Sequence, residues 1–357
     1  MSAEALKAPA VSIVIKALNE EAHIEASVRS ALKALHALSA PNGSSGEVVL
    51  SDSGSADATV ARASAYPIRI VQLAQPLERR CGIGPQLGYA HTDTPFVYLM
   101  DGDMQLQPDF LARALSLLQQ RPELAGVGGQ VLELNADHLE YRARNEKPQA
   151  QARSAEVDRL DGGGLYRRSA IESVGYLSDR NLHSYEEYEL SLRLRERGWK
   201  LWRLPEVAAT HQGHATAPYQ LLLRRWQSGY IMGLGELLRA SWLHPARRRQ
   251  VLQLRETRLY LALLAAWLLL AVALLLPLPA QGKMAAASST PLLALALMSL
   301  RKRSLERGLY AVAAWHFNAA GFLRGLLQTR RPPTEPIASR VLREPYSAKA
   351  CASGSRP

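Results

Sequence analysis

Residues 259–279 (LYLALLAAWLLLAVALLLPLP) form a run of 21 residues without a single charge. A helix needs about 20 consecutive apolar residues to cross the hydrocarbon core of a bilayer, which is ~30 Å thick. The run therefore predicts a transmembrane helix, and a buried core helix is the alternative. A chain that contains such a helix folds partly in lipid and partly in water.

Two further apolar segments follow the first run. Residues 284–300 form a second uncharged run of 17 residues, interrupted by Ser288, Ser289, Thr290 and Pro291. Residues 308–323 are apolar but carry polar side chains and are flanked by arginines, which favours an interfacial helix. Arginines and lysines before the first run and after the second predict a hairpin whose two ends lie in the cytoplasm.

The charge of the chain is divided unevenly along its length. Residues 1–223 carry 23 basic and 27 acidic side chains, whereas residues 224–357 carry 20 basic and 5 acidic ones. The excess of positive charge lies beside the apolar runs, and the rest of the chain has no such excess. This distribution favours a membrane partner and excludes nucleic acid. Residues 1–10 contain no apolar signal segment, so we expect the catalytic part in the cytoplasm, on the inner (plasma) membrane. The two cysteines, Cys81 and Cys351, are too few for a disulfide framework.

These observations predict four regions along the chain. They are a catalytic domain at 1–223, a basic amphipathic interface segment at 224–258, a transmembrane hairpin with an interfacial helix at 259–330, and a flexible tail at 331–357.

The first part of the chain alternates between short apolar strands and helices. Strands are predicted at 11–15, 47–50, 68–73 and 95–100, and helices lie between and after them, as at 20–38 and 108–120. This alternation predicts an α/β fold with a doubly wound, mostly parallel sheet. Ligands of such sheets bind beyond the carboxyl ends of the strands, so the chemistry is expected there.

Acidic side chains follow three of these strands, at 16–20, 51–57 and 101–103. Asp101 and Asp103 stand two residues apart, with Gly102 between them leaving room for a ligand. Hard divalent cations bind through one or two carboxylates together with substrate phosphates. A turn with two solvated acids is the alternative. The glycines at 82–88 lack the spacing of a dinucleotide-binding loop and follow no clear strand, which argues against nicotinamide.

A second cluster of acids lies further along the chain. A glycine-rich turn at 161–168 precedes Glu186, Glu187 and Glu189, which open a predicted helix. Acids in a first helical turn complement the helix dipole, so capping is the simplest explanation. Three acids in four residues exceed that need, and we expect a catalytic carboxylate among them.

Five motifs in this order resemble the family 2 glycosyltransferases, which have the GT-A fold. The motifs are VSIVIKALNEE, VVLSDSGSADAT, FVYLMDGDM, GGGLYRRSAIESVGYL and SYEEYELSLRLRERGWKLWRLPE, and the resemblance covers about residues 11–215.

The resemblance implies roles for particular residues. It implies that Asn19, Glu20 and Asp52 hold the nucleotide, and that Asp101 holds the ribose. It further implies that Asp103 holds a divalent metal ion, Mn²⁺ or Mg²⁺, on the diphosphate. Glu186 and Glu187 match the acid pair of the family, whose second member is the catalytic base. His211 lies where relatives carry a histidine near the diphosphate, which makes it a candidate metal ligand.

The chain departs from the family pattern at several positions. Ser53 stands where a second aspartate is common, and Pro85-Gln86-x-Gly88 stands where Arg-Asn-x-Gly is common. The base position is glutamate and not aspartate. Leu222 replaces the glutamine of the motif of processive members, which favours a single addition over polymerisation.

The resemblance implies an inverting, metal-dependent glycosyltransferase of the hexosyltransferase type. Its donor would be a nucleoside diphosphate sugar. Its acceptor would be a hydroxyl of a lipid-linked or cell-surface glycan at the membrane, as in polysaccharide biosynthesis. A catalytically inactive GT-A-like scaffold that binds nucleotide in a membrane complex is the alternative. A sugar-nucleotide pyrophosphorylase would need a basic glycine-rich loop after the first strand, where this chain has Leu18-Asn19-Glu20.

Overall fold

The computed structural model describes residues 11–42, 46–134, 153–213, 217–277 and 279–345. The chain forms two compact units, which we call the sheet unit and the helical unit. The sheet unit comprises Met1–Asn181, Glu186–Ala215 and Arg331–Pro357, and the helical unit comprises Leu182–Tyr185 and Thr216–Arg330.

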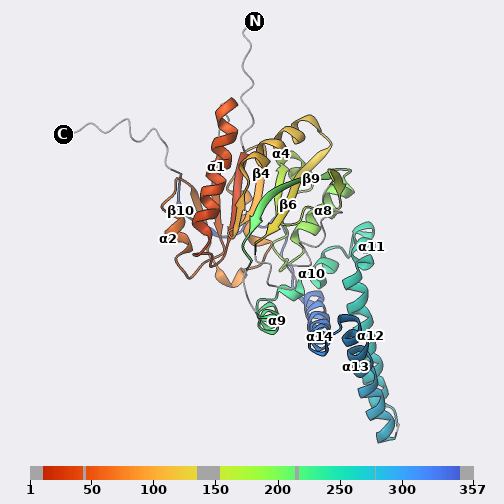
Figure 1. The fold of residues 1–357 in the computed structure, drawn as a ribbon. Helices are drawn as coiled ribbons and strands as arrows, with labels where there is room; N and C mark the ends of the chain where they lie inside the picture. Colours follow the sequence, from red (N-terminus) through yellow and green to blue (C-terminus); the bar gives the residue numbers. More distant parts are fainter. Residues whose placement is uncertain (1–10, 43–45, 135–152, 214–216, 278, 346–357) are drawn as a thin grey trace, which may run out of the picture. The chain divides into compact units, whose positions relative to one another are not determined.

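The sheet unit is built on one mixed sheet of ten strands (Figure 1). Its parallel core has the order β3-β2-β1-β4, and the buried middle of each strand is apolar because both faces of the sheet are covered. The four strands are β1 (Val11–Ala17), β2 (Gly46–Asp52), β3 (Arg69–Leu73) and β4 (Phe96–Asp101).

The remaining strands make the sheet less parallel than the sequence predicts. β8 joins β4 antiparallel, β6 and β9 pair in parallel, and the short β5 and β7 pair with β9 antiparallel. β5, β7 and β8 run opposite to β4, whereas β6 and β9 run in the same direction as β4, because β8 pairs antiparallel with both β4 and β6. Their bounds are β5 (Met104–Leu106), β6 (Leu124–Glu133), β7 (Ala155–Val157), β8 (Gly164–Arg167) and β9 (Lys200–His211).

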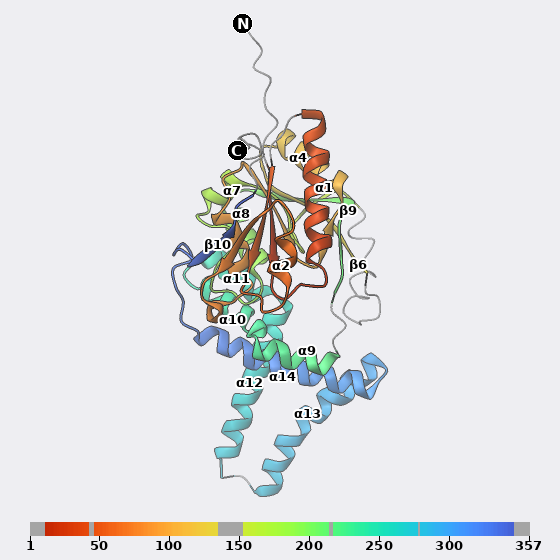
Figure 2. The same ribbon diagram turned by 90° about the vertical axis from the view of Figure 1, so that its left-hand side faces the viewer.

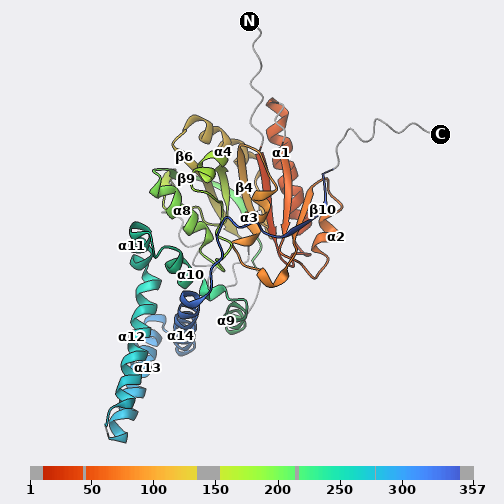
Figure 3. The same cartoon turned by 180° about the vertical axis from the view of Figure 1, so that it is seen from behind.

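Helices cover both faces of the sheet (Figures 1 and 3). One face packs against α1 (Ile24–Asn42), α2 (Thr59–Ala63) and α4 (Pro108–Gln120). The other face packs against α3 (Ile83–Ala90), α7 (Arg168–Ser173) and α8 (Glu186–Glu196), and the short 3₁₀ helix η1 (Pro76–Glu78) precedes α3.

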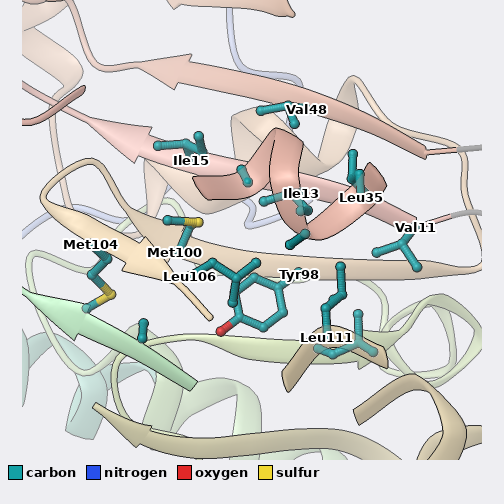
Figure 4. Packing of buried hydrophobic residues seen from close by; sticks show 14 of the residues in the cluster. Val11, Ile13, Ile15, Leu35, Val48, Tyr98, Met100, Met104, Leu106 and Leu111 are labelled. Atoms are coloured by element: carbon teal, nitrogen blue, oxygen red, sulfur yellow. The ribbon is translucent and has the colours of Figure 1, made fainter. Parts of the chain in front are cut away.

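The alternation of side chains along β1 divides the core into two layers. Val11, Ile13 and Ile15 lie in the layer under α1 and α4, and Figure 4 shows them beside Tyr98 of β4. Val14 points to the opposite layer, with Leu99. Successive side chains of a strand point to opposite faces, so the two-sided burial of β1 fixes the direction of every side chain at its end.

The expectation of a flexible tail is wrong for the described part of residues 331–357. β10 (Ser339–Arg343) pairs antiparallel with β3 and becomes the edge strand of the sheet (Figure 3). Arg180 donates to the carbonyl oxygens of Glu335 and Pro336 at 2.9 and 3.1 Å, and thereby holds the segment before β10. Without β10, the edge of β3 would present unpaired backbone N–H and C=O groups. The composition of residues 331–357 gives no sign that this segment pairs with them.

The helical unit contains the long helices α12, α13 and α14, which follow one another in the chain (Figure 2). Among the described residues, one helix, α12, is long and apolar enough to cross a membrane, and its apolar window is not buried. The second predicted run lies in α13, which contains Pro291. The helices of this unit are α9 (Pro218–Gln227), η2 (Tyr230–Met232), α10 (Gly233–Ala240), α11 (Pro245–Gln253), α12 (Arg255–Leu275), α13 (Ala280–Lys302) and α14 (Leu305–Leu327).

The packing of α3 on β1 yields a prediction about stability. A Cβ atom at Gly88 would lie 2.2 Å from Cγ1 of Val14, so Gly88→Ala forces the helix and strand apart. We expect a loss of roughly 1–3 kcal/mol in the free energy of unfolding. Gly84→Ala, in the same helix, is the matched control, because its Cβ would meet nothing closer than 3.5 Å.

Denaturant unfolding of the full chain in detergent measures both variants. The control is expected within about 0.5 kcal/mol of the wild type. Equal stability of the two variants would contradict the packing described for α3.

Candidate active site

The ends of β1, β2 and β4 bring the predicted site residues together at one edge of the sheet. These strands are direct neighbours, and Lys16 of β1 lies opposite both Ser51 of β2 and Asp101 of β4. Backbone hydrogen bonds join the loops beyond the strands, because Gly102 N donates to Lys16 O at 2.8 Å and Ser53 N donates to Ala17 O at 2.9 Å. The predicted convergence of the three strand ends is therefore present.

Asn19 connects the first two loops. Its φ of 57° lies in the left-handed region, which asparagine tolerates better than most residues. Its backbone N–H donates to Ser55 Oγ, and its side-chain Oδ1 accepts from the N–H of Ala56, both at 2.8 Å. The adjacent Glu20 donates its N–H to Thr59 Oγ1 at 2.7 Å. The two residues fix the loop after β2 against the loop after β1.

Asp52 is fully buried and supports the same loop from below. Its Oδ2 accepts from the N–H groups of Gly54 and Ser55 and from Gln72 Nε2, each at 2.9 Å. Its Oδ1 accepts from Ser55 Oγ at 2.5 Å. Since these bonds occupy both oxygen atoms, the structure supports a loop-positioning role for Asp52, and its contact with a nucleotide stays a prediction.

Asp103 points toward His211. The residue after it, Met104, lies opposite His211 in the antiparallel pairing of β5 with β9. Asp103 Oδ2 lies 3.0 Å from His211 Nε2, and Asp103 O accepts from the N–H of Gln212 at 3.1 Å. The sequence prediction that Asp103 and His211 act together therefore has a geometric basis.

Glu133 is a member of this group that the sequence did not reveal. It ends β6 opposite His211 of β9, and its Oε2 lies 2.5 Å from His211 Nδ1. The carboxylate is buried, so the imidazole is held between two acids. Burial by itself lowers the pKa of His211, but its hydrogen bonds and charge interactions with Asp103 and Glu133 outweigh this and raise it to about 9.

The geometry of this group fits a divalent metal ion. Mg²⁺ and similar cations are held by one or two protein ligands together with substrate phosphates, and Asp103 and His211 can supply two. A histidine that binds a metal usually donates its other ring N–H to a carboxylate, which is the position of Glu133. In the part of the chain that the structure describes, no three His, Cys, Asp or Glu side chains gather as a complete ligand set, so the substrate would have to provide ligands.

Glu187 occupies a second branch of the site, at the start of α8. Its carboxylate accepts from the N–H groups of Gly163 at 3.0 Å and Gly162 at 3.3 Å. These glycines have φ of 94° and 78°, and a Cβ at Gly163 would lie 2.1 Å from Leu99 O. The glycine-rich turn thus brings backbone N–H groups close to the predicted base.

The surroundings of Glu187 raise its pKa to about 7. Burial is the largest cause, and the charge of Lys16 opposes it, while the neighbouring carboxylates of Glu186, Asp161 and Asp101 raise the pKa further. A general base works best when its pKa is close to the working pH, so this environment suits proton transfer.

Lys16 is the second group that sequence reasoning did not assign. Its Nζ lies 2.8 Å from Asp101 Oδ1 and 3.9 Å from Glu186 Oε1. The signal that could have found it is a lysine at the end of an otherwise apolar central strand.

Glu189, the third acid of the predicted cluster, points away from the site. Its side chain is buried, and its Oε1 accepts from Arg193 Nε at 2.8 Å and from Tyr176 OH at 2.9 Å. Capping and packing thus explain Glu189 but not Glu187.

Comparison with known proteins agrees with the motifs. The model of the family described as Glycosyl transferase family 2 matches residues 12–175. A probable glucomannan 4-beta-mannosyltransferase 1 of Arabidopsis thaliana is 27% identical over 145 residues, which is 38% of this chain and 26% of that protein. A probable glucomannan 4-beta-mannosyltransferase 9 of Oryza sativa subsp. japonica is 27% identical over 157 residues, 41% and 29% of the respective chains. The matches thus span less than a third of these relatives.

A solved structure extends the similarity of the fold to most of the chain. The mannosyltransferase PcManGT from Pyrobaculum calidifontis, in complex with GDP-Man and Mn²⁺, aligns with a TM-score of 0.55 and 17% sequence identity. The alignment covers 89% of this chain and 87% of that one. At this identity the comparison supports the shared fold.

The group around His211 yields a prediction about metal binding. We expect Asp103→Asn to abolish metal-dependent transfer, because an amide is a poorer cation ligand than a carboxylate. Glu133→Gln should weaken Mn²⁺ binding by roughly 10–100-fold, since the partner that orients His211 is lost. Binding of Mn²⁺ in the presence of a nucleoside diphosphate is measured by calorimetry, with the exposed Asp109→Asn of α4 as the control. Unchanged metal dependence in Asp103→Asn would refute the assignment.

The acid pair yields a second prediction about this site. Glu187→Gln should lower transfer by about 10²–10⁴-fold while donor and metal binding persist, because an amide cannot accept the proton. Glu186→Gln should do less harm, since the adjacent helical position points ~100° away. Initial rates and calorimetric donor affinity separate the cases, and Glu196→Gln at the other end of α8 is the control.

Two outcomes would contradict this assignment. Normal turnover by Glu187→Gln together with loss of activity in Glu186→Gln would move the base to Glu186. Activity in both variants would leave the two acids as a helix cap.

Proposed function

We propose that the chain transfers a sugar from a nucleoside diphosphate sugar to an acceptor hydroxyl with inversion, because residues 12–175 match the model of Glycosyl transferase family 2 and the fold is similar to that of PcManGT. The observation that carries the proposal is the arrangement of two branches at one sheet edge. Asp103 and His211 form one branch, and the half-buried Glu187 forms the other.

The branch of Asp103 and His211 is suited to the diphosphate. These two residues would hold Mn²⁺ or Mg²⁺, and the ion would neutralise the charge that develops on the departing diphosphate. Glu133 orients the imidazole through its contact with Nδ1, so that Nε2 faces Asp103. Asn19, Glu20 and Asp52 shape the loops that would enclose the nucleotide.

The branch of Glu187 is suited to the acceptor. Its carboxylate would take the proton of the acceptor hydroxyl while that oxygen forms a bond to the anomeric carbon. The bond between that carbon and the diphosphate oxygen breaks in the same displacement, and its electron pair leaves with the diphosphate. The N–H groups of Gly162 and Gly163 hold the carboxylate in place throughout.

The relatives suggest which donor to test first. The matched proteins of Arabidopsis thaliana and Oryza sativa are described as glucomannan mannosyltransferases, and PcManGT was solved with GDP-Man. We therefore propose a hexosyl transfer with GDP-mannose as the first candidate donor, in polysaccharide or lipid-linked glycan assembly.

The helical unit supports a membrane location for this activity. The apolar window of α12 is uncovered, and Leu268, Leu269 and Leu275 are 66–86% exposed. A helix surface with leucines exposed to this degree is stable in contact with lipid, whereas its contact with water is unfavourable in free energy. We propose that α12 anchors the protein in the inner membrane, that α13 completes a hairpin, and that the sheet unit faces the cytoplasm.

The donor proposal is tested with the full chain in detergent. GDP-mannose, UDP-glucose, UDP-N-acetylglucosamine and dTDP-glucose are each supplied with Mn²⁺ or Mg²⁺, and release of the nucleoside diphosphate is measured. We expect metal-dependent release from one of these donors and none with chelator. No release from any donor, with nucleotide still bound, would favour the inactive scaffold.

The environment of Glu187 predicts the pH dependence of the reaction. The base must be ionised, and its pKa of about 7 means that the active fraction rises as the pH increases through 7. With saturating donor and Mn²⁺, kcat should fall about tenfold per pH unit well below 7 and level off above it. Initial rates from about pH 5.5 to about pH 8.5 measure this limb. A flat profile down to pH 5.5 would contradict the role of Glu187.

A further inference from the structure

Lys16 presents an unusual combination of place and charge. It is the second-last residue of the central strand β1, between the buried Ile15 and Ala17, and its side chain is only 17% exposed. Burying an ammonium group is costly unless opposite charges surround it. The position therefore indicates that Lys16 is held there by specific carboxylates.

Those carboxylates belong to the catalytic groups. Lys16 Nζ is 2.8 Å from Asp101, at the end of β4, and 3.9 Å from Glu186, at the start of α8. Burial lowers the pKa of Lys16, but the charges of Asp101, Glu186 and Glu187 outweigh it and raise that pKa well above its usual value. The amine therefore stays protonated across the pH range in which the enzyme is expected to work.

The cluster has more negative than positive charge. One ammonium group acts on three carboxylates, so loss of Lys16 would remove a positive charge that Asp101, Glu186 and Glu187 share. Like charges that share a site force at least one member to take up a proton. Glu187 is the most sensitive to this effect, because its partial burial already penalises the ionised form. The charged and titratable groups that act on Glu187 come from every element around it: Lys16, Asp101, Asp161, Tyr166 and Glu186.

We propose that Lys16 is a positioning residue for the transfer reaction: its ammonium group joins Asp101 to Glu186 and keeps the neighbouring Glu187 ionised. It thereby couples the end of β4, which would hold the ribose, to the start of α8, which carries the base. The inference rests on the proposed role of Glu187 and goes beyond it, because it assigns the group that sets the working pH of the base.

The test compares the acid limb of kcat in matched variants of the full chain. GDP-mannose with saturating Mn²⁺ is the probe, or the donor that the screen identifies. Lys16→Met should move the limb to higher pH by at least one unit, because the cation that stabilises the ionised base is gone. Glu186→Gln should move it in the opposite direction, because a negative neighbour of Glu187 is removed.

Two further variants provide rescue. Lys16→Arg retains the charge, so its limb should stay near that of the wild type even if kcat falls. The double variant Lys16→Met, Glu186→Gln removes one charge of each sign and should return the limb toward pH 7. Thermal unfolding in detergent verifies that each variant is folded, and Lys16→Gln replaces Lys16→Met if the latter does not fold.

Several results would overturn the proposal. A uniform drop in kcat with an unmoved limb in Lys16→Met would indicate a merely structural role. A raised KM for the donor at every pH, again with the limb in place, would make Lys16 a donor ligand. A failure of the proposed function itself gives a different result, because Glu187→Gln would then remain active. If only the inference about Lys16 fails, Glu187→Gln is inactive, and the acid limb of Lys16→Met stays at the pH of the wild type.

Discussion

The arrangement of the site depends on one constraint: each carboxylate brought to the edge of the sheet needs a compensating positive charge or N–H group. Burial penalises an ionised acid, and neighbouring acids penalise it further. The structure provides the compensating groups in two places. His211 lies between Asp103 and Glu133, and Lys16 lies beside Asp101 and Glu186. In the chain, Gly102 separates Asp101, the partner of Lys16, from Asp103, the partner of His211.

This compensation depends in turn on the register of the sheet. Lys16 and Asp101 are opposite each other only because β1 and β4 are paired in parallel with that register. Glu133 and His211 are likewise opposite in the parallel pair β6 and β9. A slip of one residue would turn each of these side chains to the other face. The apolar layers on both faces of β1 prevent such a slip, so the packing of the core and the chemistry of the site share one cause.

Much of this could be predicted from the sequence, and the exceptions have physical reasons. The strand end that carries Asp101 and Asp103 could be predicted because parallel strands end at one edge, and Glu187 because three acids open one predicted helix. The resemblance to family 2 glycosyltransferases is confirmed. Glu133 was missed because its partner, His211, is 78 residues away and only pairing of β6 with β9 joins them. Lys16 was missed because a lysine after an apolar run is ordinarily a solvated strand end. β10 was missed because the need for an edge strand lies in β3, far from residues 339–343 in the chain.

The central claim is that Glu187 removes the acceptor proton in a single displacement at the anomeric carbon. The stereochemistry of the product tests this claim most directly, because one displacement inverts the configuration and two displacements retain it. The product formed from an α-linked donor is examined by proton NMR of its anomeric signal, before any spontaneous equilibration. The account predicts a β-linked product. An α-linked product would contradict it, since retention requires a mechanism in which Glu187 is not the base of a direct transfer.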